Sequence, residues 1–164
     1  MRRVLLTGAS GFVGSAILAE LLSRGHEVSL LSRRIVDAPP TTRQIITGDF
    51  AALDIAAVRE AIRGQDAIIH AAGHAHAEDG TGGERHRRLN QDASIKLAQA
   101  AANEGAYFVY LSSIKAQVGA NASGIVRETD PPRPDDAYGM AKLEAEIERH
   151  MAPEGQSADR GQGY

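Results

Sequence analysis

Short apolar runs alternate along the chain with segments whose apolar residues recur three or four positions apart. Each short run predicts a buried strand, and the spaced pattern predicts an amphipathic helix. The predicted strands cover residues 4–6, 28–31, 44–47, 67–70 and 107–111. The predicted helices cover residues 16–24, 55–63, 84–104 and 138–150, and a glycine follows each of the first two.

The order of these elements predicts an α/β fold. Parallel strands need crossover connections, which the intervening helices provide, so we expect a parallel sheet with helices on both faces. Residues 74–83 and 118–137 break the alternation and predict loops, the second because prolines recur in it. We therefore expect one domain over residues 1–151, followed by a disordered tail over residues 152–164, which lack any periodic pattern.

Composition limits the classes of protein that such a fold serves. The 164 residues include 18 basic and 21 acidic side chains, and a net charge of −3 offers no general attraction for nucleic acid or an anionic membrane. The absence of cysteine excludes disulfides, thiolate nucleophiles and cysteine-ligated metals. No apolar stretch is long enough for a membrane span or a signal peptide. We expect a cytoplasmic protein that binds neither nucleic acid nor membranes.

Three glycines stand between the first predicted strand and the first predicted helix. Gly8, Gly11 and Gly14 have the spacing GxxGxxG. Glycine permits a tight turn and lets the backbone approach a pyrophosphate at the positive end of a helix. The same residues could serve a turn alone. Because the motif follows a strand and opens a helix, it favours dinucleotide binding.

The end of the second predicted strand indicates which dinucleotide binds. Sheets that bind NAD usually have an acidic residue here, which accepts hydrogen bonds from ribose hydroxyls. This chain has Ser32, Arg33 and Arg34 instead. A hydroxyl and two guanidinium groups suit a 2′-phosphate, because arginine binds phosphate oxygens in a fork. Paired arginines are also common on solvated surfaces, but the missing acid favours NADP(H).

A tyrosine and a lysine four residues apart mark a second candidate site. Tyr138 and Lys142 lie on one face of the last predicted helix. A nearby ammonium favours the phenolate form of a tyrosine, which makes it a usable acid and base. The spacing alone also describes an ordinary surface pair. Ser112 and Ser113 add weight, because they end the fifth predicted strand and ligands bind at that edge of a parallel sheet.

Histidines offer an alternative interpretation of the segment after the fourth predicted strand. Two imidazoles one residue apart can share a metal ion with nearby carboxylates. The residues concerned are His70, His74, His76, Glu78, Asp79 and His86. His70 lies in a predicted strand and most of the others lie in a predicted loop, so we favour no metal site.

Six segments, taken together and in order, resemble a known family. They are TGASGFVG (7–14), GDF (48–50), HAAGHAH (70–76), LNQDASIKLAQAAANEG (89–105), FVYLSSIKAQVG (108–119) and YGMAKLEAE (138–146). The sequence resembles the extended short-chain dehydrogenases/reductases, in the NAD(P)-dependent epimerase/dehydratase group. The resemblance implies a Rossmann-like doubly wound sheet with strand order 3-2-1-4-5. Nothing after Arg149 resembles the family's C-terminal substrate domain, so we expect that domain to be missing from an apparently truncated chain.

The resemblance also implies roles for individual residues. Ser113 holds the substrate oxygen, Tyr138 transfers the proton, and Lys142 binds the nicotinamide ribose and tunes Tyr138. Asn90 kinks the predicted helix over residues 84–104 or holds a water near the lysine. The implied cofactor-binding residues are Gly8, Ser10, Gly11, Phe12, Val13, Gly14, Ser32, Arg33, Arg34, Asp49, Phe50, Ala71, Ala72, Gly73, Tyr138 and Lys142.

The activity implied by the resemblance is hydride transfer on a nucleotide sugar, by an epimerase, a dehydratase or a 4-ketoreductase, with NADP(H) favoured over NAD(H). The alternative is a truncated, non-catalytic dinucleotide-binding module, which measured turnover distinguishes from an enzyme. The family's dimers form through the helices that correspond to residues 84–104 and 138–150, so these helices are candidates for a homodimer interface.

Overall fold

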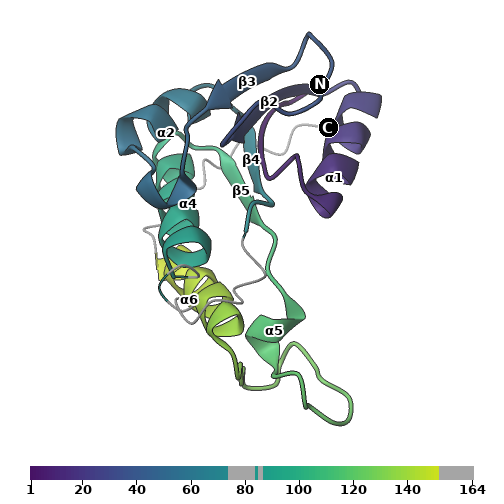
Figure 1. Ribbon diagram of the computed structural model, residues 1–164, viewed down its shortest axis with the longest axis vertical. Coiled ribbons are helices and arrows are strands. Elements are labelled where there is room, and N and C mark those ends of the chain that lie inside the picture. The colour runs from purple at the N-terminus through teal and green to yellow at the C-terminus, as the bar shows by residue number, and fades with distance from the viewer. Residues whose placement is uncertain (74–83, 85–86, 152–164) are drawn as a thin grey trace, which may run out of the picture.

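The computed structural model describes residues 1–73, 84 and 87–151, and a five-stranded sheet lies at its centre (Figure 1). All strand pairs are parallel, in the order β3-β2-β1-β4-β5. The strands are β1 (Arg3–Thr7), β2 (Glu27–Ser32), β3 (Arg43–Ile46), β4 (Ala67–His70) and β5 (Tyr107–Tyr110). This topology confirms the predicted α/β fold and strand order, and each predicted strand is present to within one residue at either end.

Helices cover both faces of the sheet. Helix α1 (Phe12–Ser23) lies on one face, whereas α2 (Ile55–Ile62) and α4 (Ala93–Asn103) lie on the other (Figure 1). Helix α6 (Ala137–Met151) packs beside α4, and the short α5 (Ile114–Gln117) packs against α6. The two helical layers therefore enclose the sheet, as expected for crossovers between parallel strands.

Neighbouring residues of the central strands point to opposite faces of the sheet, and both faces are buried. Leu5 of β1 packs with Ile68 of β4 and Leu97 of α4, whereas Leu6 packs with Leu30 of β2 in the cluster beneath α1. All five side chains have an exposure of 0%. A sheet covered on both sides needs apolar residues at successive positions, which explains why the strands read as continuous apolar runs. This core fixes the register at the carboxyl ends of β1, β2 and β4.

Two predicted helices differ from the structure. Helix α1 begins at Phe12 rather than at residue 16, because the glycine turn ends at Gly11, the residue before the helix. The predicted helix over residues 84–104 is a π-helix, η2 (Arg87–Asp92), before it becomes α4. Apolar spacing does not distinguish the two forms, since both place residues separated by one turn on the same face.

The remaining segments contain little regular structure. A short 3₁₀ helix, η1 (Phe50–Ala52), follows β3, and an isolated parallel bridge joins Val118 to Arg133 within the predicted loop over residues 118–137. Among the described residues, no helix has the length and apolar character needed to cross a membrane. The predicted loop at residues 74–83 and the predicted tail at residues 152–164 lie outside the described residues.

Candidate functional site

A cleft of about 230 Å³ opens at the carboxyl ends of β1, β2 and β4. Ligands of open parallel sheets bind at this edge, where each strand leads into a turn. The cleft is lined by Gly8, Ser10, Gly11, Ser32, Arg33, Phe50, Ala71, Ala72, Gly73 and Leu89. All of these except Leu89 are among the cofactor-binding residues predicted from the sequence.

The glycine turn lies directly against the turn after β4. Gly8 has a φ of +77°, and a Cβ built on it would lie 2.5 Å from the backbone N of Ala72. The carbonyl of Gly8 accepts a hydrogen bond from the N–H of Gly11 at 2.9 Å, and a Cβ at Gly14 would overlap that carbonyl. The sequence needs glycine at these positions because two backbone segments meet without room for a side chain.

Seven predicted cofactor-binding residues do not line this cleft: Phe12, Val13, Gly14, Arg34, Asp49, Tyr138 and Lys142. Phe12 and Val13 stand at the start of α1, where their side chains are 95% and 52% exposed. Their place in the motif reflects the start of the helix, because the residues after a glycine turn become its first turn. Their contact with a cofactor stays a prediction.

Ser32 and Arg33 both line the cleft but do not offer the same chemistry. The hydroxyl of Ser32 donates its hydrogen to the carbonyl of Arg34 at 2.7 Å, so this hydrogen already has a partner. Arg33 is exposed at the cleft wall. The guanidinium of Arg33 is therefore the group that can donate to an anion here.

Lys142 is the one buried lysine among the described residues, with an exposure of 3%. Its Nζ donates to the carbonyl of Leu111 at 2.9 Å and lies 4.6 Å from the ring centre of Tyr110 and 5.8 Å from that of Tyr138. Burial lowers the pKa of Lys142 from 10.5 to about 8, so the ammonium form still predominates at neutral pH. The structure thus brings Tyr138 and Lys142 together, as their helical spacing predicts.

Gly73 connects this lysine with the cleft. A Cβ built on Gly73 would lie 3.2 Å from Oδ1 of Asn90 and 3.3 Å from Nζ of Lys142, so the glycine leaves space in front of both groups. Asn90 is fully buried in η2. Its backbone carbonyl accepts hydrogen bonds from the hydroxyls of Ser94 at 2.6 Å and Tyr110 at 3.4 Å. Side chains therefore provide donors to this carbonyl in the π-helical segment, where the α-helical backbone pattern is interrupted.

Lys115 joins the two elements that carry Ser113 and Tyr138. Its backbone N–H donates to Oγ of Ser113 at 3.3 Å, and its Nζ donates to the carboxylate of Asp136 at 2.6 Å. The same carboxylate accepts from the N–H of Gly139 at 2.6 Å, in the first turn of α6. A Cβ at Gly139 would overlap the carbonyl of Lys115, so α5 and α6 are in close contact. Sequence reasoning missed Lys115 and Asp136, although each stands two residues from a predicted catalytic residue.

His70 is fully buried, and both of its ring nitrogens have hydrogen-bond partners. Burial, reinforced by the charge of Lys142, lowers the pKa of His70 from 6.5 to about 3, so the ring is neutral. A ring whose two nitrogens are engaged offers no lone pair to a metal. Within the described part of the chain, no three histidine, aspartate or glutamate side chains gather as metal ligands would. The other residues of the metal alternative lie outside it: His74, His76, Glu78, Asp79 and His86.

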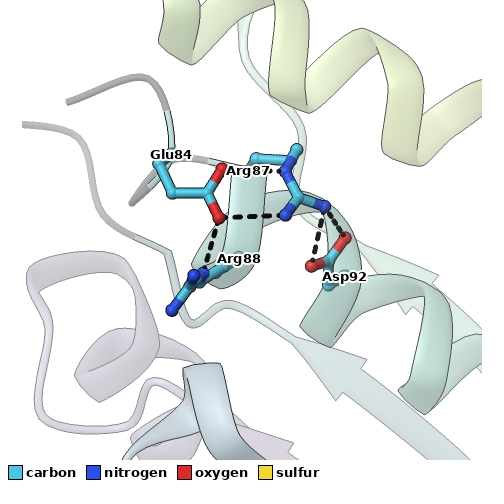
Figure 2. Close-up of polar contacts among 4 residues, drawn as sticks. All are labelled: Glu84, Arg87, Arg88 and Asp92. Carbon is cyan, nitrogen blue, oxygen red and sulfur yellow. Dashed lines mark hydrogen bonds and ion pairs between the residues drawn. The ribbon is translucent and has the colours of Figure 1, made fainter. Parts of the chain in front are cut away.

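Four charged side chains gather at the exposed start of η2, and we name them the Glu84 cluster (Figure 2). Arg87 lies between Glu84 at 3.0 Å and Asp92 at 3.2 Å, and Arg88 contacts the same Glu84 carboxylate at 2.7 Å. Hydrogen bonds from the two arginines lower the pKa of Glu84 from 4.5 to about 2. The four charges balance, so the Glu84 cluster presents no net charge to a ligand.

Comparison with curated proteins gives relatives over most of the chain. Methionine adenosyltransferase 2 subunit beta from Bos taurus is 38% identical over 152 residues, covering 88% of this chain and 42% of that protein. UDP-glucose 4-epimerase from Vibrio cholerae is 30% identical over 157 residues, covering 88% of this chain and 45% of that protein. The chain therefore spans less than half the length of these two relatives.

Solved structures share the fold. MoeE5 in complex with UDP-glucuronic acid and NAD matches with a TM-score of 0.80 at 30% identity, covering 92% of this chain and 49% of that chain. The model of the NAD dependent epimerase/dehydratase family matches residues 4–154, which include the glycine turn, the Tyr138–Lys142 pair and every strand except the first residue of β1. The chain belongs to the NAD dependent epimerase/dehydratase family.

Proposed function

We propose that the cleft binds a nicotinamide dinucleotide, with its pyrophosphate against the turn of Gly8 and Gly11. The observation that carries this proposal is the approach of Gly8 to Ala72, which builds the cleft wall from backbone alone. Helix α1 starts at this wall, and no side chain caps it at Gly11, so its first N–H groups are available to an anion. MoeE5, which has the same fold, is described with NAD bound.

We further propose that NADP(H) is preferred over NAD(H). Arg33 lines the cleft, and no acidic side chain does so among the described residues. A guanidinium stabilises a 2′-phosphate, whereas a ribose hydroxyl needs the acceptor that is missing here. Because the hydrogen of Ser32 is already donated to Arg34, the preference depends on Arg33.

The proposed chemistry is hydride transfer at a carbinol or keto carbon of a nucleotide sugar. A nicotinamide ring, when bound, accepts or supplies the hydride. Ser113 donates its hydroxyl hydrogen to the substrate oxygen, since its Oγ accepts from Lys115. Tyr138 moves the proton, and the ammonium of Lys142 stabilises the negative charge that develops on the tyrosine, a role that its distance of 5.8 Å from the ring centre supports. The relatives named for UDP-glucose and UDP-glucuronic acid support this substrate class.

Calorimetric titration with NADPH and NADH tests the cofactor proposal. We expect tighter binding of NADPH, and Arg33→Ala should lower NADPH affinity about ten- to hundredfold, since a hydrogen bond to a charged group contributes about 1.5–3 kcal/mol. NADH affinity should change little. The matched control is Arg43→Ala, at the exposed amino end of β3. Equal or tighter binding of NADH would refute the preference, and binding of neither dinucleotide would refute the cofactor proposal.

A tyrosine-to-phenylalanine pair tests the proposed chemistry. With UDP-linked sugars and both cofactors, we follow the absorbance of reduced nicotinamide. Tyr138→Phe should lower turnover by about 10²–10⁴-fold, the contribution of a positioned acid or base, while cofactor affinity stays nearly unchanged. Tyr107→Phe is the control, because Tyr107 is 77% exposed on β5. Wild-type turnover in Tyr138→Phe excludes this residue as the proton donor.

The second candidate function is a non-catalytic dinucleotide-binding module. It is favoured by one comparison, because the relative from Bos taurus is named as a subunit of an adenosyltransferase and is 38% identical. Both candidates predict cofactor binding, so affinity does not separate them. Turnover of a nucleotide sugar that depends on Tyr138 supports the enzyme, and saturable cofactor binding without any turnover supports the module.

The helices predicted to form a homodimer remain candidates for that interface. Met140 and Ile147 of α6 are 47% and 50% exposed, which leaves apolar surface on the helix. Size-exclusion chromatography tests this proposal: a dimer that Ile147→Glu converts to a monomer supports it, and a wild-type monomer contradicts it. The cytoplasmic location stays a prediction from the sequence.

A further inference from the structure

A series of hydrogen bonds crosses the protein behind the cleft, and we name it the His70 relay. The N–H of Ala72 donates to Oγ1 of Thr7 at 3.1 Å, and this Oγ1 lies 2.6 Å from Nδ1 of His70. Nε2 of His70 lies 3.0 Å from Oγ of Ser94, which donates to the carbonyl of Asn90 at 2.6 Å. Thr7 and His70 are register partners at the carboxyl ends of β1 and β4.

The partners at the two ends fix the direction of every bond. Ser94 has one hydroxyl hydrogen, and the carbonyl of Asn90 can only accept it. Oγ of Ser94 must therefore accept from His70, which places the ring hydrogen on Nε2. Nδ1 is then an acceptor, so Thr7 donates its hydroxyl hydrogen there and uses a lone pair for the N–H of Ala72. Thr7, His70 and Ser94 thus each donate once and accept once within the His70 relay.

The surroundings make each of these bonds expensive to lose. Thr7, His70 and Asn90 have an exposure of 0%, and Ser94 of 2%. On one side the His70 ring faces the ring of Tyr110, with centres 5.8 Å apart. These four residues are shielded from bulk water, so a broken link among them leaves a buried polar group without a partner.

Both ends of the His70 relay lie beside Gly73, the residue that leaves space in front of Lys142. Ala72 belongs to the cleft wall against which Gly8 packs. Asn90 belongs to η2, and its Oδ1 lies beside the position of Gly73 together with Nζ of Lys142. A shift of either end would change the width of this space.

We propose that His70 is a positioning residue: as its neutral Nε2–H tautomer, it holds the cleft wall at Ala72 in register with Asn90. The consequence for cofactor binding rests on the proposed function. The tautomer and the protection of the Ala72 amide do not, because both are properties of the free protein.

The first experiment uses nitrogen chemical shifts of the histidine rings in the free protein. We expect His70 to show a protonated Nε2 and an unprotonated Nδ1 throughout the pH range in which the protein is folded. The Ala72 amide should exchange with solvent slowly. A hydrogen on Nδ1, an imidazolium at neutral pH, or rapid exchange of the Ala72 amide would each overturn the proposal.

Two substitutions each keep one half of the His70 relay. Asparagine places its amide near the position of Nδ1, and glutamine reaches towards that of Nε2. His70→Asn should keep the Ala72 amide protected, whereas His70→Gln should expose it and keep the bond to Ser94. His70→Leu, which can make neither bond, should accelerate Ala72 exchange and weaken NADPH binding, each by about tenfold, the factor that corresponds to one lost hydrogen bond.

A threonine pair covers the case in which the His70 variants fail to fold. Thr7→Val removes the hydroxyl that receives the Ala72 N–H and should reproduce the effects of His70→Leu. Thr42→Val removes a buried hydroxyl for which the described structure shows no hydrogen-bond partner, so Ala72 exchange and NADPH affinity should not change. Equal effects of the two substitutions on Ala72 exchange contradict the proposal. If the exchange results hold but the wild-type chain binds no dinucleotide, the proposed function fails and the assignment of the His70 relay stands.

Discussion

Two polar networks contact the same π-helical segment and differ in charge and in burial. The His70 relay reaches Asn90 from inside the protein and contains only neutral groups. The Glu84 cluster covers the start of the segment from outside, and its four side chains carry two positive and two negative charges (Figure 2). Their shortest bonds are similar, at 2.6 Å in the first and 2.7 Å in the second.

The comparison shows that neither bond length nor charge decides which network contributes more to stability. The side chains of the Glu84 cluster are 36% to 56% exposed, so water replaces any bond that breaks and screens the charges that remain. In the His70 relay a broken bond has no such replacement. Of the two networks, the neutral, buried one is hydrogen-bonded to the cleft wall, through the N–H of Ala72.

Lys142 sharpens the comparison, because it is a charged side chain that is buried, with an exposure of 3%. Its pKa is lowered from 10.5 to about 8, so the unfolded chain binds more protons between these values and stability rises with pH across that window. Below pH 8 the burial costs on the order of 3 kcal/mol. Lys142→Met should raise the free energy of unfolding at pH 7, remove the rise between pH 8 and 10.5, and weaken cofactor binding. Urea unfolding across this range measures the effect, and a destabilised Lys142→Met contradicts our assignment of the cost.

We expect the next largest effect on stability from His70, at acid pH. Its pKa is lowered from 6.5 to about 3, so below pH 6.5 the unfolded chain takes up a proton that the folded protein refuses, and stability is lost. At pH 5 this loss should be about 2 kcal/mol relative to pH 7. His70→Gln should unfold with less dependence on pH over this interval. An unchanged pH dependence in His70→Gln would break the link between burial and neutrality.

The Glu84 cluster should give the smallest effect. The pKa of Glu84 is lowered from its usual value of 4.5 to about 2, so its carboxylate is ionised and the contacts are formed at pH 7. Because they are exposed, Glu84→Gln should leave the urea midpoint nearly unchanged, in low and in high salt. Ser94→Ala removes the buried hydroxyl of α4 that donates to Asn90 of η2, so it should lower the urea midpoint clearly. A larger effect of Glu84→Gln than of Ser94→Ala would reverse the comparison.

The sequence predicted the parts of this molecule that depend on local patterns. Continuous apolar runs locate the strands, since both faces of the sheet are buried, and the glycine spacing locates the turn after β1. The spacing of Tyr138 and Lys142 places both side chains on one face of α6, and the structure brings them together.

Other features depend on contacts between distant segments, for which the sequence carries no local signal. Thr7 meets His70 through strand register across 63 positions, and His70 meets Ser94 across 24. Lys115 reaches Asp136 across 21 positions, which apolar periodicity does not report. The π-helical turn of η2 was also missed, because apolar spacing does not report the wider backbone hydrogen-bond pattern that defines it.

The most direct test of cofactor binding in the cleft is an amide chemical-shift titration of the labelled chain with NADPH. We expect saturable changes that are largest at the amides of Gly8, Gly11, Ala72 and Gly73, and smaller changes with NADH at equal concentration. Arg33→Ala should weaken the NADPH response, whereas Arg43→Ala should not. The absence of saturable changes, or changes centred on the cavity beside the loop at Gly119 and Ser123 instead of the cleft, would contradict cofactor binding in the cleft.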